Sequence, residues 1–104
     1  MHENIGCSQS NRVLFGDTWL STEVPKILAS QAYRNNGVLF ITWDEDDGSA
    51  SNQVLTLVVA PGLGHRSSSK PYDHYSLLAT IEDILGVGRL GHAAQAQPMS
   101  DLVG

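Results

Sequence analysis

Two apolar runs, at residues 38–43 and 54–60, constrain the fold of this chain more than any other part of its sequence. Both are rich in β-branched side chains and lack polar alternation, a pattern typical of strands buried on both faces of a sheet. Two such strands are rarely stable without further strands or a covering layer. The sequence therefore predicts two buried strands that need more neighbours than these 104 residues supply.

Apolar residues at helical spacing flank the two runs on either side. Before the first run, Asp17 is a candidate N-cap of a helix that ends near Tyr33, and Pro25 either kinks this helix or starts a second turn. After the second run, a stripe of apolar residues predicts a helix that starts near Asp73 and is ended by Gly86 and Gly88. The order helix, strand, strand, helix indicates an α/β layered fold with buried strands flanked by helices.

Charge and apolar content limit the partners of the chain. The net charge is −5, and the six Lys and Arg residues are scattered, which argues against a nucleic-acid partner. Residues 1–11 lack the apolar core of a signal peptide. The longest apolar run, at residues 54–61, is too short to cross a bilayer, so no transmembrane segment is expected.

A run of four carboxylates, Asp44, Glu45, Asp46 and Asp47, directly follows the first predicted strand. Ligands of open α/β sheets lie beyond the carboxyl ends of strands, and adjacent carboxylates there suit a hard divalent cation. An acidic surface loop with solvated charges would show the same run. The spacing alone leaves both interpretations open.

His74 stands at the expected start of the last helix. Free N–H groups and the helix dipole favour anions there, so the imidazole could bind a metal ion or a phosphate oxygen. Alternatively, Asp73 or Ser76 caps the helix and His74 is an exposed bystander. No nucleophile elbow, zinc-ligand spacing or Walker loop is present in the sequence.

Four segments, taken together, resemble the bacterial phosphoesterase family that includes acid phosphatases and phospholipases C and belongs to the alkaline phosphatase superfamily. The segments are GDTWL with VPKIL at residues 16–28, FITWDE at 40–45, VAPG at 59–62 and YDHYSLLATIED at 72–83. They follow the order of the family, and four collinear segments are far more specific than any one alone.

The resemblance implies hydrolysis of phosphate esters at a divalent metal site, with this chain as the C-terminal fragment of an alkaline phosphatase-like fold. Asp44 and Glu45 would be metal ligands, and His74 would be a metal or phosphate ligand. Residues 1–3 resemble a Met-His-Asp stretch of the family, which makes His2 a further candidate, although Glu3 replaces the usual Asp. The serine or threonine nucleophile of the family lies in an N-terminal part that is missing here, so the chain alone is expected to be inactive.

Residues 1–92 are thus interpreted as the C-terminal part of a phosphoesterase domain and residues 93–104 as a partly ordered tail. Two alternatives stay open: a non-catalytic module whose sheet edges pair with a second chain, or an inactive remnant. The sequence does not separate phosphomonoesters from phospholipid diesters, and calcium, magnesium, manganese, zinc and iron all suit the expected ligands. The resemblance fits an extracellular or cell-envelope location.

Overall fold

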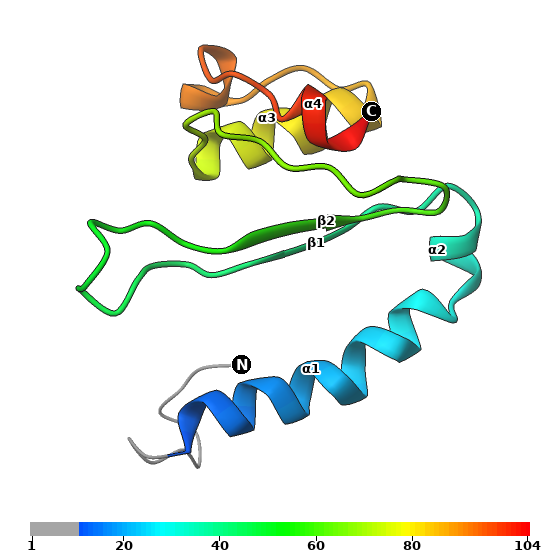
Figure 1. Ribbon diagram of the computed structural model, residues 1–104. Coiled ribbons are helices and arrows are strands. Elements are labelled where there is room, and N and C mark those ends of the chain that lie inside the picture. Colours follow the sequence, from blue (N-terminus) through cyan, green and yellow to red (C-terminus); the bar gives the residue numbers. More distant parts are fainter. Residues whose placement is uncertain (1–10) are drawn as a thin grey trace. The chain divides into compact units, whose positions relative to one another are not determined.

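The computed structural model describes residues 11–104, and their contacts divide the chain into two compact units with the boundary between Leu39 and Phe40. The first unit contains helices α1 (Arg12–Leu28) and α2 (Gln31–Arg34), and strand β1 (Leu39–Thr42) begins at its end (Figure 1). The second unit continues with strand β2 (Thr56–Val59), helix α3 (His74–Leu85), the 3-10 helix η1 (Gly91–Ala94) and helix α4 (Ser100–Val103). The predicted α/β class is confirmed. Within residues 11–104, no helix has the length and apolar character needed to cross a membrane.

Helix α1 begins and ends earlier than the sequence predicts. Asp17 lies inside α1 and is not its N-cap, because the helical backbone has already started five residues before it, at Arg12. Pro25 lacks an N–H donor, and the helix stops within one turn of it. Ser30 then adopts an extended backbone, and its hydroxyl accepts a hydrogen bond from the Tyr33 N–H at 3.2 Å. The last part of the single predicted helix is therefore a separate helix, α2.

The link between α2 and β1 requires a glycine. A Cβ atom on Gly37 would lie 2.5 Å from the Cα atom of Tyr33 and 2.7 Å from the carbonyl oxygen of Ala32. Both neighbours are backbone atoms, which cannot move aside as a flexible side chain could. Any other residue at this position would push the chain away from α2.

Strands β1 and β2 pair as a two-stranded antiparallel sheet (Figure 1). Thr42 Oγ1 donates to the Leu55 carbonyl at 3.0 Å and lies 2.9 Å from Thr56 Oγ1, so these hydroxyls join the two strands. The prediction that both strands are fully buried is wrong for this chain, since their residues are half-buried and Leu57 is 44% exposed. Full burial needs a layer on each face, and α3 packs mainly against η1.

Helix α3 matches its prediction at both ends. The Asp73 carboxylate accepts a hydrogen bond from the Ser76 N–H at 2.9 Å, and the Ser76 hydroxyl accepts one from the Asp73 N–H at 3.2 Å. These reciprocal bonds form a capping box. At the other end, Gly86 takes a left-handed backbone with φ 66°, and the Val87 N–H bonds the Glu82 carbonyl at 3.1 Å. Glycine suits this position because it has no Cβ to clash.

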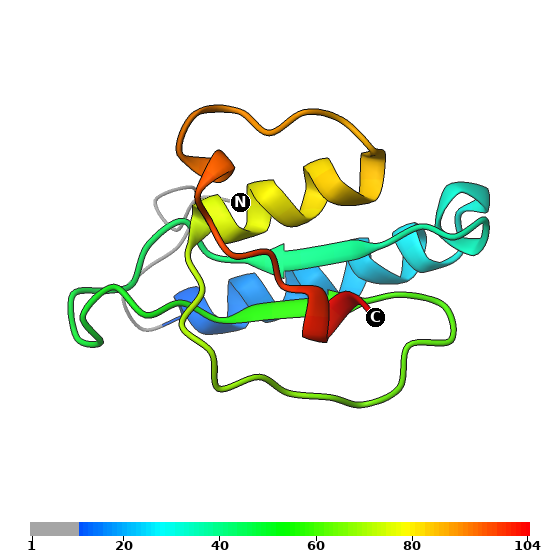
Figure 2. The ribbon, with the colours of Figure 1, turned by 90° about the horizontal axis from the view of Figure 1, so that it is seen from above.

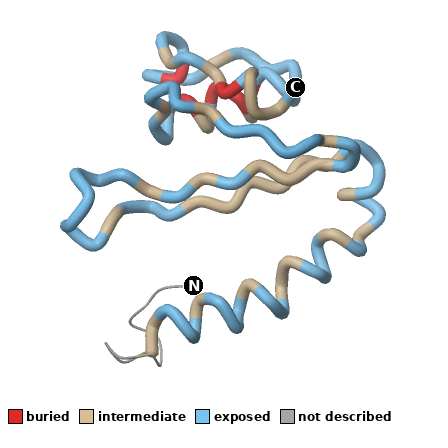
Figure 3. The backbone as a smooth tube through the Cα atoms, viewed as in Figure 1, coloured by how far each residue is buried: buried red, intermediate tan, exposed pale blue. Residues whose placement is uncertain are grey.

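The core of the second unit lies between α3 and the C-terminal segment, and α3, η1 and α4 all lie on one face of the strand pair (Figures 1 and 2). Ala79 and Ala93 are fully buried and Met99 is 3% exposed. Figure 3 shows the buried residues gathered in this part of the chain. Residues 93–104, which the sequence presents as a partly ordered tail, thus include two residues of this core.

Candidate functional site

The four carboxylates after β1 fall into two pairs, because the loop between β1 and β2 uses mainly the second pair, Asp46 and Asp47, for its own hydrogen bonds. The carboxylate of Asp46 accepts three backbone hydrogen bonds, from Gly48 at 2.9 Å, Ala50 at 2.9 Å and Asn52 at 2.8 Å. These bonds, that from Gly48 first, hold the pKa of Asp46 below its ordinary value. Asp46 therefore closes the loop between the strands, and both of its oxygens are occupied.

Asp47 has a similar local role, because its carboxylate accepts hydrogen bonds from the hydroxyl and the N–H of Ser49, and these lower its pKa. Asp44 and Glu45 differ. Both are exposed, and neither forms an ion pair with a Lys or Arg among residues 11–104. The Asp44 carboxylate accepts one bond, from the Glu45 N–H at 3.0 Å. The carboxylate oxygens that are available to a ligand are thus mainly those of Asp44 and Glu45.

The structure brings His74 to Asp44 across thirty residues of sequence. The Nε2 atom of His74 lies 2.8 Å from the backbone carbonyl oxygen of Asp44. Because a carbonyl oxygen only accepts, Nε2 donates this bond, and the neutral tautomer that does so carries its lone pair on Nδ1. Histidines that bind metal ions usually donate their second ring N–H to a carbonyl or carboxylate in this way.

Asp44, Glu45 and His74 supply a partial ligand set. Carboxylate oxygens and an imidazole nitrogen fit a divalent cation chemically. Residues 11–104 nevertheless contain no group of three or more His, Cys, Asp or Glu side chains placed to hold a metal ion. A complete site would need ligands from outside these residues. His2 lies outside the described residues.

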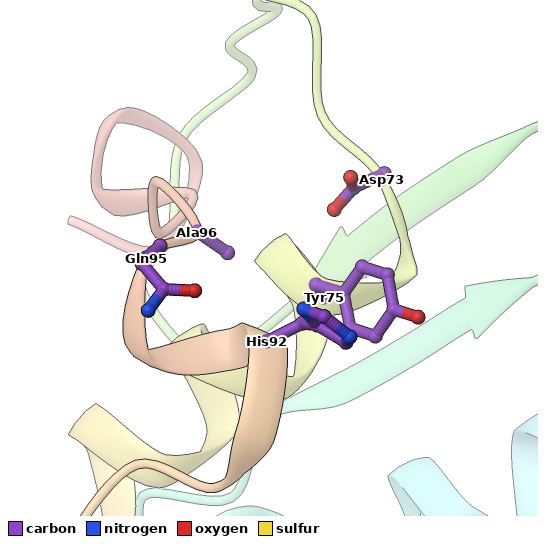
Figure 4. A pocket seen from close by; sticks show the side chains of 5 residues that line it. All are labelled: Asp73, Tyr75, His92, Gln95 and Ala96. Carbon is purple, nitrogen blue, oxygen red and sulfur yellow. The ribbon is translucent and has the colours of Figure 1, made fainter.

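A pocket of about 310 Å³ opens beside the start of α3. Figure 4 shows its lining: Asp73, Tyr75, His92, Gln95 and Ala96. The rings of Tyr75 and His92 meet edge to face, with centroids 5.2 Å apart. Sequence patterns did not connect His92 with the start of α3, because the contact depends on how the chain returns after α3.

A second cluster, also missed from the sequence, surrounds the carboxylate of Asp101 in α4. Its Oδ1 accepts a hydrogen bond from the Tyr72 hydroxyl at 2.5 Å, and its Oδ2 accepts one from the Ser68 hydroxyl at 2.7 Å. The ammonium of Lys70 lies 3.3 Å from Oδ2. These contacts, that of Tyr72 first, lower the pKa of Asp101 to about 2, and the same bond raises the pKa of Tyr72. The segment that leads into α3 is thus joined to α4.

Comparison with known proteins identifies the family of the chain. The sequence profile of the Phosphoesterase family matches residues 6–88, which include Asp44, Glu45 and His74. A phosphatidylinositol-3-phosphatase of Mycobacterium tuberculosis is 37% identical over 89 residues, covering 86% of this chain but only 29% of the relative. No solved structure matches significantly. The resemblance seen in the four segments is confirmed, and the chain belongs to the Phosphoesterase family.

Proposed function

We propose that this chain contributes metal and phosphate ligands to a phosphoesterase site that hydrolyses phosphate esters, and that it does not contribute the nucleophile. The hydrogen bond between His74 and the Asp44 carbonyl carries the proposal, because it joins two segments that the family profile matches. The name of the Mycobacterium tuberculosis relative favours a phosphomonoester substrate over a phospholipid diester. The chain spans 29% of that relative, so the complete reaction would need residues beyond those described here.

Each of the three residues has a distinct part in this proposal. Asp44 and Glu45 would bind a divalent cation through their exposed carboxylates, while the backbone of Asp44 holds the ring of His74. His74 would present the lone pair of Nδ1 to the cation or to a phosphate oxygen. A bound cation would neutralise charge on the phosphoryl group and lower the pKa of a hydroxyl nucleophile.

The ligand role can be tested by titrating the chain with Mn²⁺ and following its binding by calorimetry. Because Asp44 and Glu45 supply the available carboxylates, the double variant Asp44→Ala/Glu45→Ala should lose most of the Mn²⁺ affinity. Asp17→Ala is the matched control, since Asp17 is an exposed carboxylate on α1. Equal affinity in all three proteins would overturn the proposed ligands.

The catalytic part can be tested in a chimaera, in which this chain replaces the matched segment of the Mycobacterium tuberculosis relative. Release of phosphate from 4-nitrophenyl phosphate should depend on divalent cations and fall at least about a hundredfold in His74→Ala, the scale of losing an electrostatic contact at the reacting group. Asp47→Asn should retain activity, because the carboxylate of Asp47 is occupied by hydrogen bonds from Ser49.

The chain alone should release no phosphate from the same substrate, because it is proposed to lack the nucleophile. Metal-dependent release of phosphate that is lost in Asp44→Ala/Glu45→Ala would contradict this proposal.

A further inference from the structure

We propose that Asp101 is a positioning residue for His74, acting through Tyr72 on the chain that enters α3. This inference rests on the proposed function in one respect only, which is that His74 serves as a ligand. Asp101 lies in α4, beyond residues 6–88 that the family profile matches. The proposal therefore gives a task in the site to a segment outside the matched region.

Three side chains of the segment before α3 converge on one carboxylate. Tyr72 donates to Asp101 at 2.5 Å, Ser68 donates at 2.7 Å, and Lys70 forms an ion pair at 3.3 Å. Hydrogen bonds to an ionised acceptor are about twice as strong as neutral ones. Pro71 further restricts the backbone between Lys70 and Tyr72. Tyr72 is held in this way two residues before His74.

The position of α4 is set in turn by α3. The Met99 N–H, directly before α4, donates to Thr80 Oγ1 at 2.8 Å, and this hydroxyl donates to the Ser76 carbonyl at 2.7 Å. Both bonds are buried, and Thr80 is 1% exposed. The contacts thus form a closed ring. Thr80 of α3 bonds Met99, and the chain leads from Met99 to Asp101. Asp101 bonds Tyr72, and the chain leads from Tyr72 back to the first residue of α3.

His74 is the residue that this ring controls most directly. As the first residue of α3, it takes its orientation from the direction in which the chain enters the helix. Its Nε2 atom lies 2.8 Å from the Asp44 carbonyl oxygen, so a change in that direction would alter this hydrogen bond. Errors of about 1 Å in the placement of a catalytic group can reduce rates by a hundredfold, so small shifts here matter.

The tautomer of His74 gives a readout that a general loss of stability would not change. Imidazole ¹⁵N chemical shifts report which of the two ring nitrogens carries the proton. In the unmodified chain we expect the Nε2–H form alone, because Nε2 donates to Asp44. In Asp101→Ala and Tyr72→Phe we expect the Nδ1–H form to appear as well, and Asp101→Asn should have a smaller effect because its amide oxygen still accepts a hydrogen bond.

Asp83→Asn is the matched control, because it weakens the 2.7 Å ion pair with Arg89 near the other end of α3. It should leave the tautomer of His74 unchanged. Tyr72→Phe keeps the ring and loses one hydroxyl, so it keeps the test valid if Asp101→Ala does not fold. A single tautomer in folded Asp101→Ala and Tyr72→Phe would overturn the proposal, as would mixed tautomers in the unmodified chain or an equal change in Asp83→Asn.

Mn²⁺ titration of the same variants separates this inference from the proposed function. If both hold, Asp101→Ala should weaken Mn²⁺ binding about tenfold, the lower end for loss of a residue that orients a ligand. A changed tautomer in the chain, together with a chimaera whose activity is unaltered by His74→Ala, would support the positioning role and refute the ligand role. If Asp101→Ala changed the tautomer but left Mn²⁺ affinity unaltered, while His74→Ala lowered that affinity, the positioning of a ligand by Asp101 would be overturned.

Discussion

Helices α1 and α3 show two different ways in which a helix of this chain is held. The longer helix, α1, has 17 residues and none of them is buried. The shorter helix, α3, has 12 residues, a capping box at its start, a left-handed glycine after its end and four buried residues. Helical stability in proteins comes mainly from packing and capping and much less from length. We infer that α3 is the more stable helix and that α1 contributes little to the free energy of unfolding.

The largest effect should follow from Thr80→Val, which removes the hydroxyl between Ser76 and Met99. The Met99 N–H would lose its partner in a buried place, which costs about 2 kcal/mol. Urea unfolding should show this loss, and hydrogen exchange should place it in α3. Thr22→Val is the control in α1, where an exposed hydroxyl bonds the Thr18 carbonyl at 3.1 Å, and it should change stability by less than about 0.5 kcal/mol. Equal losses of stability in Thr80→Val and Thr22→Val would show that α1 and α3 contribute alike to the stability of the chain.

Gly86→Ala should have the next largest effect. The left-handed backbone at Gly86, with φ 66°, is unfavourable for a residue with a Cβ, and the change should cost about 1 kcal/mol. Gly88→Ala is the matched control, because a Cβ there would meet no atom within 4 Å and its φ is not in the left-handed region. Thermal unfolding of the two variants checks the prediction, and similar melting temperatures would refute the importance of the glycine cap.

Acid should release α4 from the segment before α3 within a narrow range of pH. The pKa of Asp101 is lowered to about 2, so its stabilising contribution is complete above the ordinary pKa of about 3.9 and is lost as pH falls toward 2. Tyr72 fluorescence or the Tyr72 ring signals in NMR should change in this range. Asp101→Asn should abolish the change, whereas a change that persists in this variant would assign the transition to another group.

The smallest effect is expected for Asp17→Ala, even though the sequence presents Asp17 as a helix cap. A true N-cap carboxylate is worth about 1 kcal/mol, but Asp17 lies inside α1 and is exposed. We expect a change within about 0.5 kcal/mol, measured by urea unfolding. A loss of about 1 kcal/mol would mean that α1 begins at Asp17 after all, as the sequence suggested.

Local patterns in the sequence predicted the elements that depend on near neighbours. The ends of α3, capped by Asp73 and Gly86, were predicted from the sequence because capping boxes and glycine caps use residues that are close in sequence. The start of α1 was missed, because a good capping residue such as Asp17 can also stand inside a helix. The burial of β1 and β2 was overestimated, since an apolar run shows what a strand can pack against and not what covers it.

The candidate site could be predicted only in part. Asp44, Glu45 and His74 were proposed as ligands by resemblance, which stays a prediction, and spacing could not show that Asp46 and Asp47 serve the loop. All four members of the acidic run are carboxylates, and only the backbone of the loop makes them different. Asp101 gave no local signal at all, because its partners lie about thirty residues away in the sequence.

The ring of contacts through Asp101 also has a consequence for the order in which the chain folds. The bonds that cap α3 join residues at most five apart, whereas those from His74 to Asp44 and from Tyr72 to Asp101 join residues 30 and 29 apart. Contacts between near neighbours form faster, because less chain entropy is lost when they close. During synthesis α3 can therefore form early, whereas the bond from Tyr72 to Asp101 can close only after Asp101 has been added to the chain. If Asp101 positions His74 as proposed, the candidate site matures later than the helix that carries it.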